Sequence, residues 1–220
     1  DRQGIFVDMI MATNVNQRKE VLKKLVPLMK DDFVQILKAM EGYKVTIRLF
    51  DPPLHEFLPS SKNEKVLARA KELEEVNPMM GHRGVRLGIT YPEIYEMQIK
   101  AVFEATAKLV KKKINAKPQI MIPQVGSIEE LNHIKSIYDN VKSDMEKKYK
   151  IKFKINFGTM LEVVRACLTS GELANTAEFF SFGTNDLTQA VFSFSREDAE
   201  SKFLEEYKKK EILETSPFQS

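Results

Sequence analysis

Two short apolar runs in the carboxyl-terminal third of the chain constrain its fold more than any other feature. Residues 153–158 and 178–183 are rich in apolar and aromatic side chains, and the turns of small residues after them carry Glu162 and Asp186. In parallel α/β sheets the strands are buried apolar ribbons, and polar groups just beyond their carboxyl ends face the crevice where ligands bind. The pattern therefore predicts a parallel sheet with both carboxylates at one edge.

Glu162 and Asp186 have the chemistry of a cation site. Two carboxylates, with the amide of Asn185 alongside, suit a hard cation such as Mg²⁺, which retains water and binds substrate oxygens. On residue type alone, the alternative that both are ordinary acidic residues at helix amino termini is favoured. Composition does not decide between the two.

The rest of the chain continues the alternation of strand-like and helix-like segments. A helical lead-in segment is predicted for residues 1–41, followed by parallel βαβ units over 42–220, all within a single domain. A hydrophobic content of 43% over 220 residues supports a core of that size. Five strands are predicted, near residues 45–49, 84–88, 119–125, 153–158 and 178–183.

Composition limits the partners and the compartment. A formal charge of +3 gives no support for nucleic acid or a membrane as a partner. The single cysteine, Cys167, excludes an intrachain disulfide and fits a reducing, cytoplasmic setting. No secretory or membrane-spanning pattern is visible. The chain begins at Asp1 without Met, so we expect it to be a piece of a longer protein, and organelle targeting stays open.

Two arginines occupy positions where a ligand could reach them. Arg48 ends a strand-like run before Pro52 and Pro53, and it could equally be a salt-bridge partner for Asp51 or Glu56. Arg83 is flanked by glycines, which would let a ligand approach closely. The alternative for Arg83 is a solvated side chain on a flexible connector.

The amino-acid sequences of several segments resemble those of one protein family. The signature of the phosphoenolpyruvate-utilising enzymes is similar to residues 179–189, Phe-Phe-Ser-Phe-Gly-Thr-Asn-Asp-Leu-Thr-Gln. The second acidic motif of these enzymes is similar to residues 158–162, Gly-Thr-Met-Leu-Glu. Residues 77–84 and 121–126 also resemble family segments. Residues 48–59 resemble the dikinase branch rather than the synthase or Enzyme I branches. The resemblance spans essentially the whole chain, with departures at Gln124, Phe157 and Val164.

The resemblance implies a fold, an activity and a set of site residues. The implied fold is α/β, a (β/α)₈ barrel that is incomplete here at both ends, with about five parallel strands. The implied activity is that of the dikinase branch, which converts ATP, pyruvate and phosphate to AMP, phosphoenolpyruvate (PEP) and diphosphate. Phosphoryl transfer is assigned to Arg48 and Arg83, Mg²⁺ binding to Glu162 and Asp186, and substrate binding to these four with Gly183, Thr184 and Asn185.

The resemblance also implies partners. These are PEP or pyruvate, a phosphohistidine domain and a second copy in a homodimer. We expect the nucleotide-binding domain, the phosphohistidine domain and the catalytic cysteine segment of this family to lie outside the chain. The piece should therefore bind substrate better than it turns it over, and its open strand edges should favour association. The alternatives are a synthase or Enzyme I type of phosphotransferase and a non-catalytic PEP-binding module.

Overall fold

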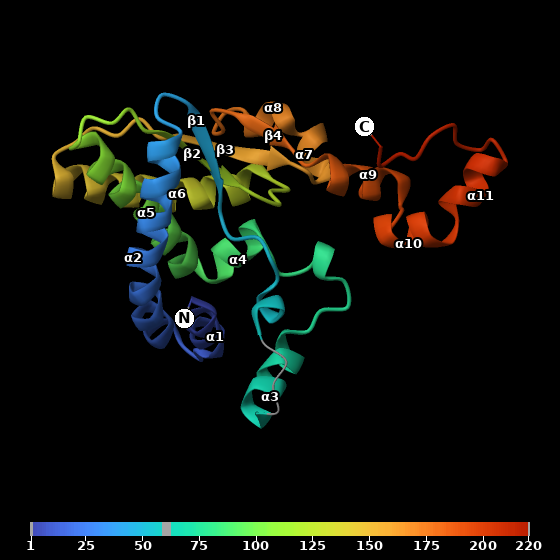
Figure 1. Cartoon of the computed structure of the whole chain (residues 1–220), viewed down its shortest axis with the longest axis horizontal. Coiled ribbons are helices and arrows are strands. Elements are labelled where there is room, and N and C mark those ends of the chain that lie inside the picture. Colours follow the sequence, from blue (N-terminus) through green and yellow to red (C-terminus); the bar gives the residue numbers. More distant parts are fainter. Residues whose placement is uncertain (1, 59–62, 220) are drawn as a thin grey trace.

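Four parallel strands form the sheet, in the order β1-β2-β3-β4. The computed structural model describes residues 2–58 and 63–219, and its strands curl into part of a barrel (Figure 1). Because all neighbouring pairs are parallel, the carboxyl ends of the strands meet at one edge. The strands are β1 (Lys44–Arg48), β2 (Lys117–Ile122), β3 (Asn156–Leu161) and β4 (Phe180–Phe182).

Helices connect and cover the strands, as parallel pairing requires. The long helices pack in sequence, α2 against α5 and α5 against α6, beside the sheet (Figure 1). The helices up to α5 are α1 (Arg2–Met11), α2 (Val15–Ala39), the 3₁₀ turns η1 (Leu54–Phe57) and η2 (Pro78–Met80), α3 (Glu64–Leu73), α4 (Val85–Thr90) and α5 (Pro92–Val110). The later helices are α6 (Ile128–Tyr149), α7 (Val164–Leu168), α8 (Ser170–Leu173), α9 (Thr184–Phe192), α10 (Arg196–Lys202) and α11 (Leu204–Lys209).

The core lies between the sheet and the helices α5 and α6. In β2 every residue after Lys117 is buried, as expected for a central strand covered on both faces. Phe103 of α5, Tyr138 of α6 and Phe157 of β3 are almost fully buried, and Tyr138 packs against both phenylalanine rings. α6 begins with a capping box between Ser127 and Glu130, which fixes where the chain turns from strand to helix.

The predicted fold class is confirmed, but the prediction of a strand at 84–88 was wrong. These residues form the start of α4. The alternation of Val85, Arg86 and Leu87 looks like a strand, yet Gly84 adopts a positive φ of 57° and serves as the helix N-cap. Gly88 then lets α4 lie against the ring of Tyr95, because a Cβ there would meet it at 2.4 Å.

The chain after β4 is packed less deeply than the rest. α9 contains no buried residue, and α10 and α11 extend away from the sheet (Figure 1). Beyond α9, Phe194, Phe203 and Tyr207 form a small aromatic cluster of their own. Phe182 of β4 is 65% exposed, which is unusual for an aromatic residue on a strand.

No helix in the described part of the chain is both long and apolar enough to cross a bilayer. Pro59, the last residue of the segment that resembles the dikinase branch, lies outside the described residues. The same is true of Ser61, whose spacing to Glu64 predicts a capping box at a helix start.

Candidate active site

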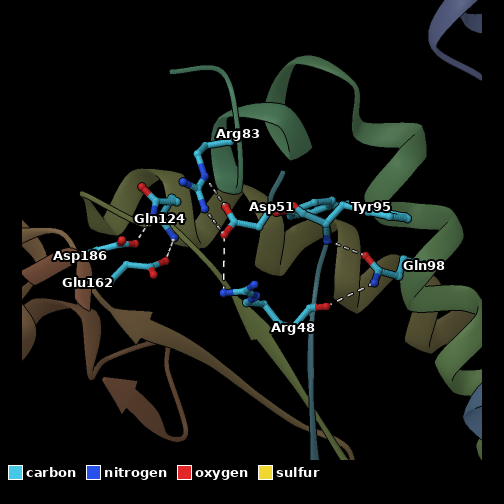
Figure 2. A network of polar contacts seen from close by, with 9 residues as sticks. Arg48, Asp51, Arg83, Tyr95, Gln98, Gln124, Glu162 and Asp186 are labelled. Carbon is cyan, nitrogen blue, oxygen red and sulfur yellow. Dashed lines mark hydrogen bonds and ion pairs between the residues drawn. The ribbon is translucent and has the colours of Figure 1, made fainter. Parts of the chain in front are cut away.

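Arg48 and Arg83 meet at a buried carboxylate, Asp51. Arg83 donates two hydrogen bonds to it, from Nε to Oδ1 at 3.0 Å and from Nη2 to Oδ2 at 2.6 Å. Nη1 of Arg48 lies 3.6 Å from Oδ2 of the same residue. The side chain of Asp51 is 1% exposed, whereas those of Arg83 and Arg48 are 17% and 48% exposed. Asp51 therefore lies between the two guanidinium groups, anchors both and leaves Arg48 accessible (Figure 2).

Helix α5 holds the backbone that carries Arg48 and Asp51. The side chain of Gln98 accepts a hydrogen bond from Phe50 N at 2.9 Å and donates one to Arg48 O at 3.3 Å. The hydroxyl of Tyr95 donates to Phe50 O at 2.9 Å. These bonds pair backbone N–H and C=O groups at the end of β1, where Pro52 and Pro53 prevent a longer strand (Figure 2).

Glu162 and Asp186, which we call the carboxylate pair, are linked through Gln124. Glu162 follows β3 and is 4% exposed, and its Oε1 accepts a hydrogen bond from Gln124 N at 2.6 Å. The side-chain amide of Gln124 donates to Oδ2 of Asp186 at 3.2 Å. Gly183 allows α9 to begin beside Glu162, because a Cβ on it would lie 2.5 Å from that of Glu162.

Burial and neighbouring charge perturb the protonation of this site. Burial raises the pKa of Glu162 to about 7; the hydrogen bond from Gln124 N opposes this shift, and the charges of Asp51 and Asp186 add to it. For Arg83, burial lowers the pKa, but the hydrogen bonds and charge of Asp51 outweigh it and the pKa is raised. Arg83 thus stays charged, while Glu162 changes charge near neutral pH.

The charges at the site fit a divalent cation bound with an anionic ligand. When ionised, the three carboxylates exceed the two arginines by one negative charge, which a divalent cation would turn into a net positive charge. Among residues 2–58 and 63–219, no three His, Cys, Asp or Glu side chains form a ready-made metal cage. Mg²⁺ does not require one, since it binds through one or two carboxylates together with water and ligand oxygens. The carboxylate pair therefore fits Mg²⁺.

A cavity of about 350 Å³ opens beside the carboxylate pair. It is large enough for a three-carbon acid with a phosphoryl group, and its wall is partly apolar. Cys167 does not line it and packs against the core instead. The lining residues include Met79, Met80, Arg86, Gln124, Val163 and Arg165.

The other sequence-predicted residues lie at the start of α9. Leu187 N donates the first helical hydrogen bond of α9, to Gly183 O, so the N–H groups of the three preceding residues lie outside the helical ladder. Thr184 and Asn185 are exposed, and Oδ1 of Asn185 accepts a hydrogen bond from Arg196 at 3.1 Å. The side-chain oxygen of Asn185 thus lies beside Arg196.

Sequence reasoning missed the two residues that connect the site. Asp51 was considered only as a partner for Arg48, although a carboxylate before two prolines, next to a glycine-flanked arginine, could have suggested a shared anchor. Gln124 stood out only as a departure from the family pattern. Its contacts depend on a positive φ of 61°, which no sequence signal indicates for glutamine.

The comparisons with known proteins identify the class. The family profile described as "PEP-utilising enzyme, PEP-binding domain" matches residues 5–215. The chain therefore belongs to the PEP-utilising enzymes, and the matched part is the PEP-binding domain.

Within that class, several curated proteins similar to the chain are pyruvate, phosphate dikinases. The pyruvate, phosphate dikinase of Entamoeba histolytica is 48% identical over 240 residues, covering 100% of this chain and 27% of that protein. Pyruvate, phosphate dikinase 1, chloroplastic, of Arabidopsis thaliana is 46% identical, covering 100% and 24%. The Clostridium symbiosum enzyme is 46% identical, covering 96% and 26%. The predicted likeness to the dikinase branch is confirmed, and the chain spans about a quarter of the length of these relatives.

Proposed function

We propose that this chain binds PEP and pyruvate for a pyruvate, phosphate dikinase. The overall reaction would be ATP + pyruvate + phosphate to AMP + PEP + diphosphate. In the step assigned to this chain, a phosphoryl group passes between a phosphohistidine on another domain and the enolate oxygen of pyruvate. The observation that carries the proposal is the convergence of two arginines and the carboxylate pair at the carboxyl edge of the sheet.

Glu162 and Asp186 would hold Mg²⁺. When bound, the cation would supply Lewis-acid stabilisation of the negative charge on the enolate oxygen and neutralise the substrate carboxylate. The raised pKa of Glu162 supports this role, because a carboxylate that is costly to ionise alone gains most from a nearby positive charge.

Arg48 and Arg83 would bind the oxygens of the phosphoryl group in transfer. A guanidinium group presents a planar pair of donors that matches two phosphoryl oxygens, which an ammonium group cannot do. Asp51 uses Nε and Nη2 of Arg83 and thereby fixes the plane of its guanidinium group. Arg48 has the more exposed side chain and a longer contact with Asp51, so it is the arginine with more freedom to follow the phosphoryl group.

The start of α9 would bind the substrate carboxylate. The N–H groups of Thr184 and Asn185 precede the helical ladder, and a helix amino terminus favours an anion. The amide nitrogen of Asn185 is a further donor, since its oxygen is engaged by Arg196. Gly183 would allow the substrate to approach the backbone closely.

Two partners of the chain belong to the same proposal. A phosphohistidine domain would dock at the carboxyl edge, where both arginines lie. A second copy would associate with the chain in a homodimer. The unpaired outer edges of β1 and β4 within the described sheet, and the exposed Phe182, support association with other protein surfaces.

Calorimetry with oxalate tests the proposal. Oxalate is a planar dianion that resembles the enolate of pyruvate. Binding to the chain should require Mg²⁺ and should weaken at least about tenfold in Asp186→Asn, which loses a charged ligand. Asp198→Asn on the exposed helix α10 is the matched control and should bind as the wild type does. Two outcomes would refute the assignment of Mg²⁺ to the carboxylate pair. One is oxalate binding that is equal with and without Mg²⁺, and the other is equal oxalate binding by Asp186→Asn and Asp198→Asn.

A further inference from the structure

We propose that Gln124 is a positioning residue that sets the geometry of the carboxylate pair for its cation. The inference rests on the proposed function, since it assumes that Glu162 and Asp186 bind a cation. Gln124 contacts both carboxylates, one through its backbone N–H and the other through its side-chain amide. Figure 2 shows both of these contacts as dashed lines.

Asp186 needs a hydrogen bond from Gln124 because apolar packing does not fix the position of helix α9. It lies in the first turn of α9, which has no buried residue. Packing against the core therefore leaves the position of the Asp186 carboxylate only weakly fixed. A polar bond to a well-packed part of the molecule can supply the missing constraint.

Gln124 is well placed to supply that constraint. It is 5% exposed and follows β2, whose last five residues are all buried. Its backbone is held at a φ of 61° by the hydrogen bond to Glu162. Gly84 lies against its side chain, where an added Cβ would approach the Cβ of Gln124 to 2.7 Å. The amide thus extends from a confined backbone toward Asp186.

A neutral amide suits this position. Two adjacent carboxylates repel each other, and a donor that touches both groups offsets part of the repulsion. An arginine or lysine here would add a positive charge that competes with the cation, whereas an amide leaves the negative charge intact. It also occupies only one oxygen of Asp186, so the other oxygen stays available.

Cation binding to the chain without substrate measures the effect directly. Free Mn²⁺ is counted by electron paramagnetic resonance during titration of the wild type, Gln124→Met and Gln124→Asn. Methionine keeps the length and removes the donor, while asparagine keeps the amide and tolerates positive φ but is too short. Gln119→Met, at a buried glutamine within the preceding strand β2, is the matched control. We expect both Gln124 variants to bind Mn²⁺ about tenfold more weakly, by loss of one charge-assisted hydrogen bond, and the control to match the wild type.

A second readout separates positioning from general stability. In a full-length dikinase that contains this chain, with Mg²⁺ as activator of phosphoryl transfer, the activation constant of Gln124→Met should rise about tenfold, while kcat at saturating Mg²⁺ stays within about threefold. Affinities of both Gln124 variants within twofold of the wild type would overturn the inference and leave the proposed function standing. Absence of Mn²⁺ binding by the wild type itself would overturn the proposed function and, with it, the role of Gln124.

Discussion

Replacing Glu162 by glutamine should stabilise the metal-free protein at alkaline pH. The pKa of Glu162 is raised on folding, so the fold favours the neutral carboxyl group. Its contribution to stability is fully present below the ordinary value of 4.5 and is lost as the pH rises through about 7. Glutamine mimics the neutral form at every pH, and its oxygen can still accept the hydrogen bond from Gln124 N.

The size of the effect follows from the pKa shift. A rise from 4.5 to about 7 corresponds to roughly 3 kcal/mol in the free energy of unfolding. Water in the adjacent cavity screens the charge and reduces this value. We therefore expect the advantage of Glu162→Gln over the wild type to grow by about 2 kcal/mol between pH 5 and pH 8.

Urea unfolding in the presence of a chelator measures this difference. Free energies of unfolding are compared at pH 5 and pH 8 for the wild type, Glu162→Gln and Glu172→Gln. Glu172 is exposed on α8, so its variant should follow the wild type at both values of pH. Saturating Mg²⁺ at pH 8 should narrow or reverse the advantage of Glu162→Gln, because the cation stabilises the ionised wild type. The reasoning would be refuted if the free energies of unfolding of the wild type and Glu162→Gln differed by the same amount at pH 5 and pH 8.

Three further predictions concern other parts of the site and the sheet. Arg48→Lys keeps the charge but loses the planar pair of donors. We therefore expect kcat/KM for phosphoryl transfer to fall by about 30-fold, equivalent to about 2 kcal/mol. An unchanged kcat/KM would show that Arg48 is a salt-bridge partner only. Gly183→Ala forces a Cβ against Glu162, so urea unfolding should show a loss of about 1–3 kcal/mol, whereas Gly171→Ala, in open space, should be tolerated. Light scattering should show a mass above 25.3 kDa that increases with concentration, and a monomer at all concentrations would contradict association through open edges.

The four strands of the sheet could be predicted from the sequence because an apolar run that ends in a polar turn is a local signal. The runs before Glu162 and Asp186 proved to be neighbouring parallel strands, β3 and β4, whose turns meet at one edge. The segment at 84–88 was misread because a short apolar run fits a strand and a buried helical turn equally well. The packing of Gly88 against Tyr95 and the positive φ of Gly84 at the helix N-cap decide for the helix.

The connections within the site could not be read from the sequence. The bonds from Gln124 to Glu162 and Asp186 span 38 and 62 residues, and they depend on the exact turn after β2. Asn185 was expected beside the carboxylates from its place in the motif, but its bond to Arg196 depends on where α10 lies. Local patterns therefore indicated the candidate site, while the hydrogen-bond network among its residues required the tertiary structure.

In the proposed function, the carboxylate pair holds a cation to which the substrate oxygens also bind. Electron paramagnetic resonance of Mn²⁺ bound to the chain with ¹⁷O-labelled oxalate tests it most directly, since ¹⁷O broadens the Mn²⁺ lines only when it is a direct ligand. We predict broadening with the wild type and no bound-Mn²⁺ signal with the double variant Glu162→Gln, Asp186→Asn. Bound Mn²⁺ without broadening, or an unchanged spectrum in the double variant, would contradict the account.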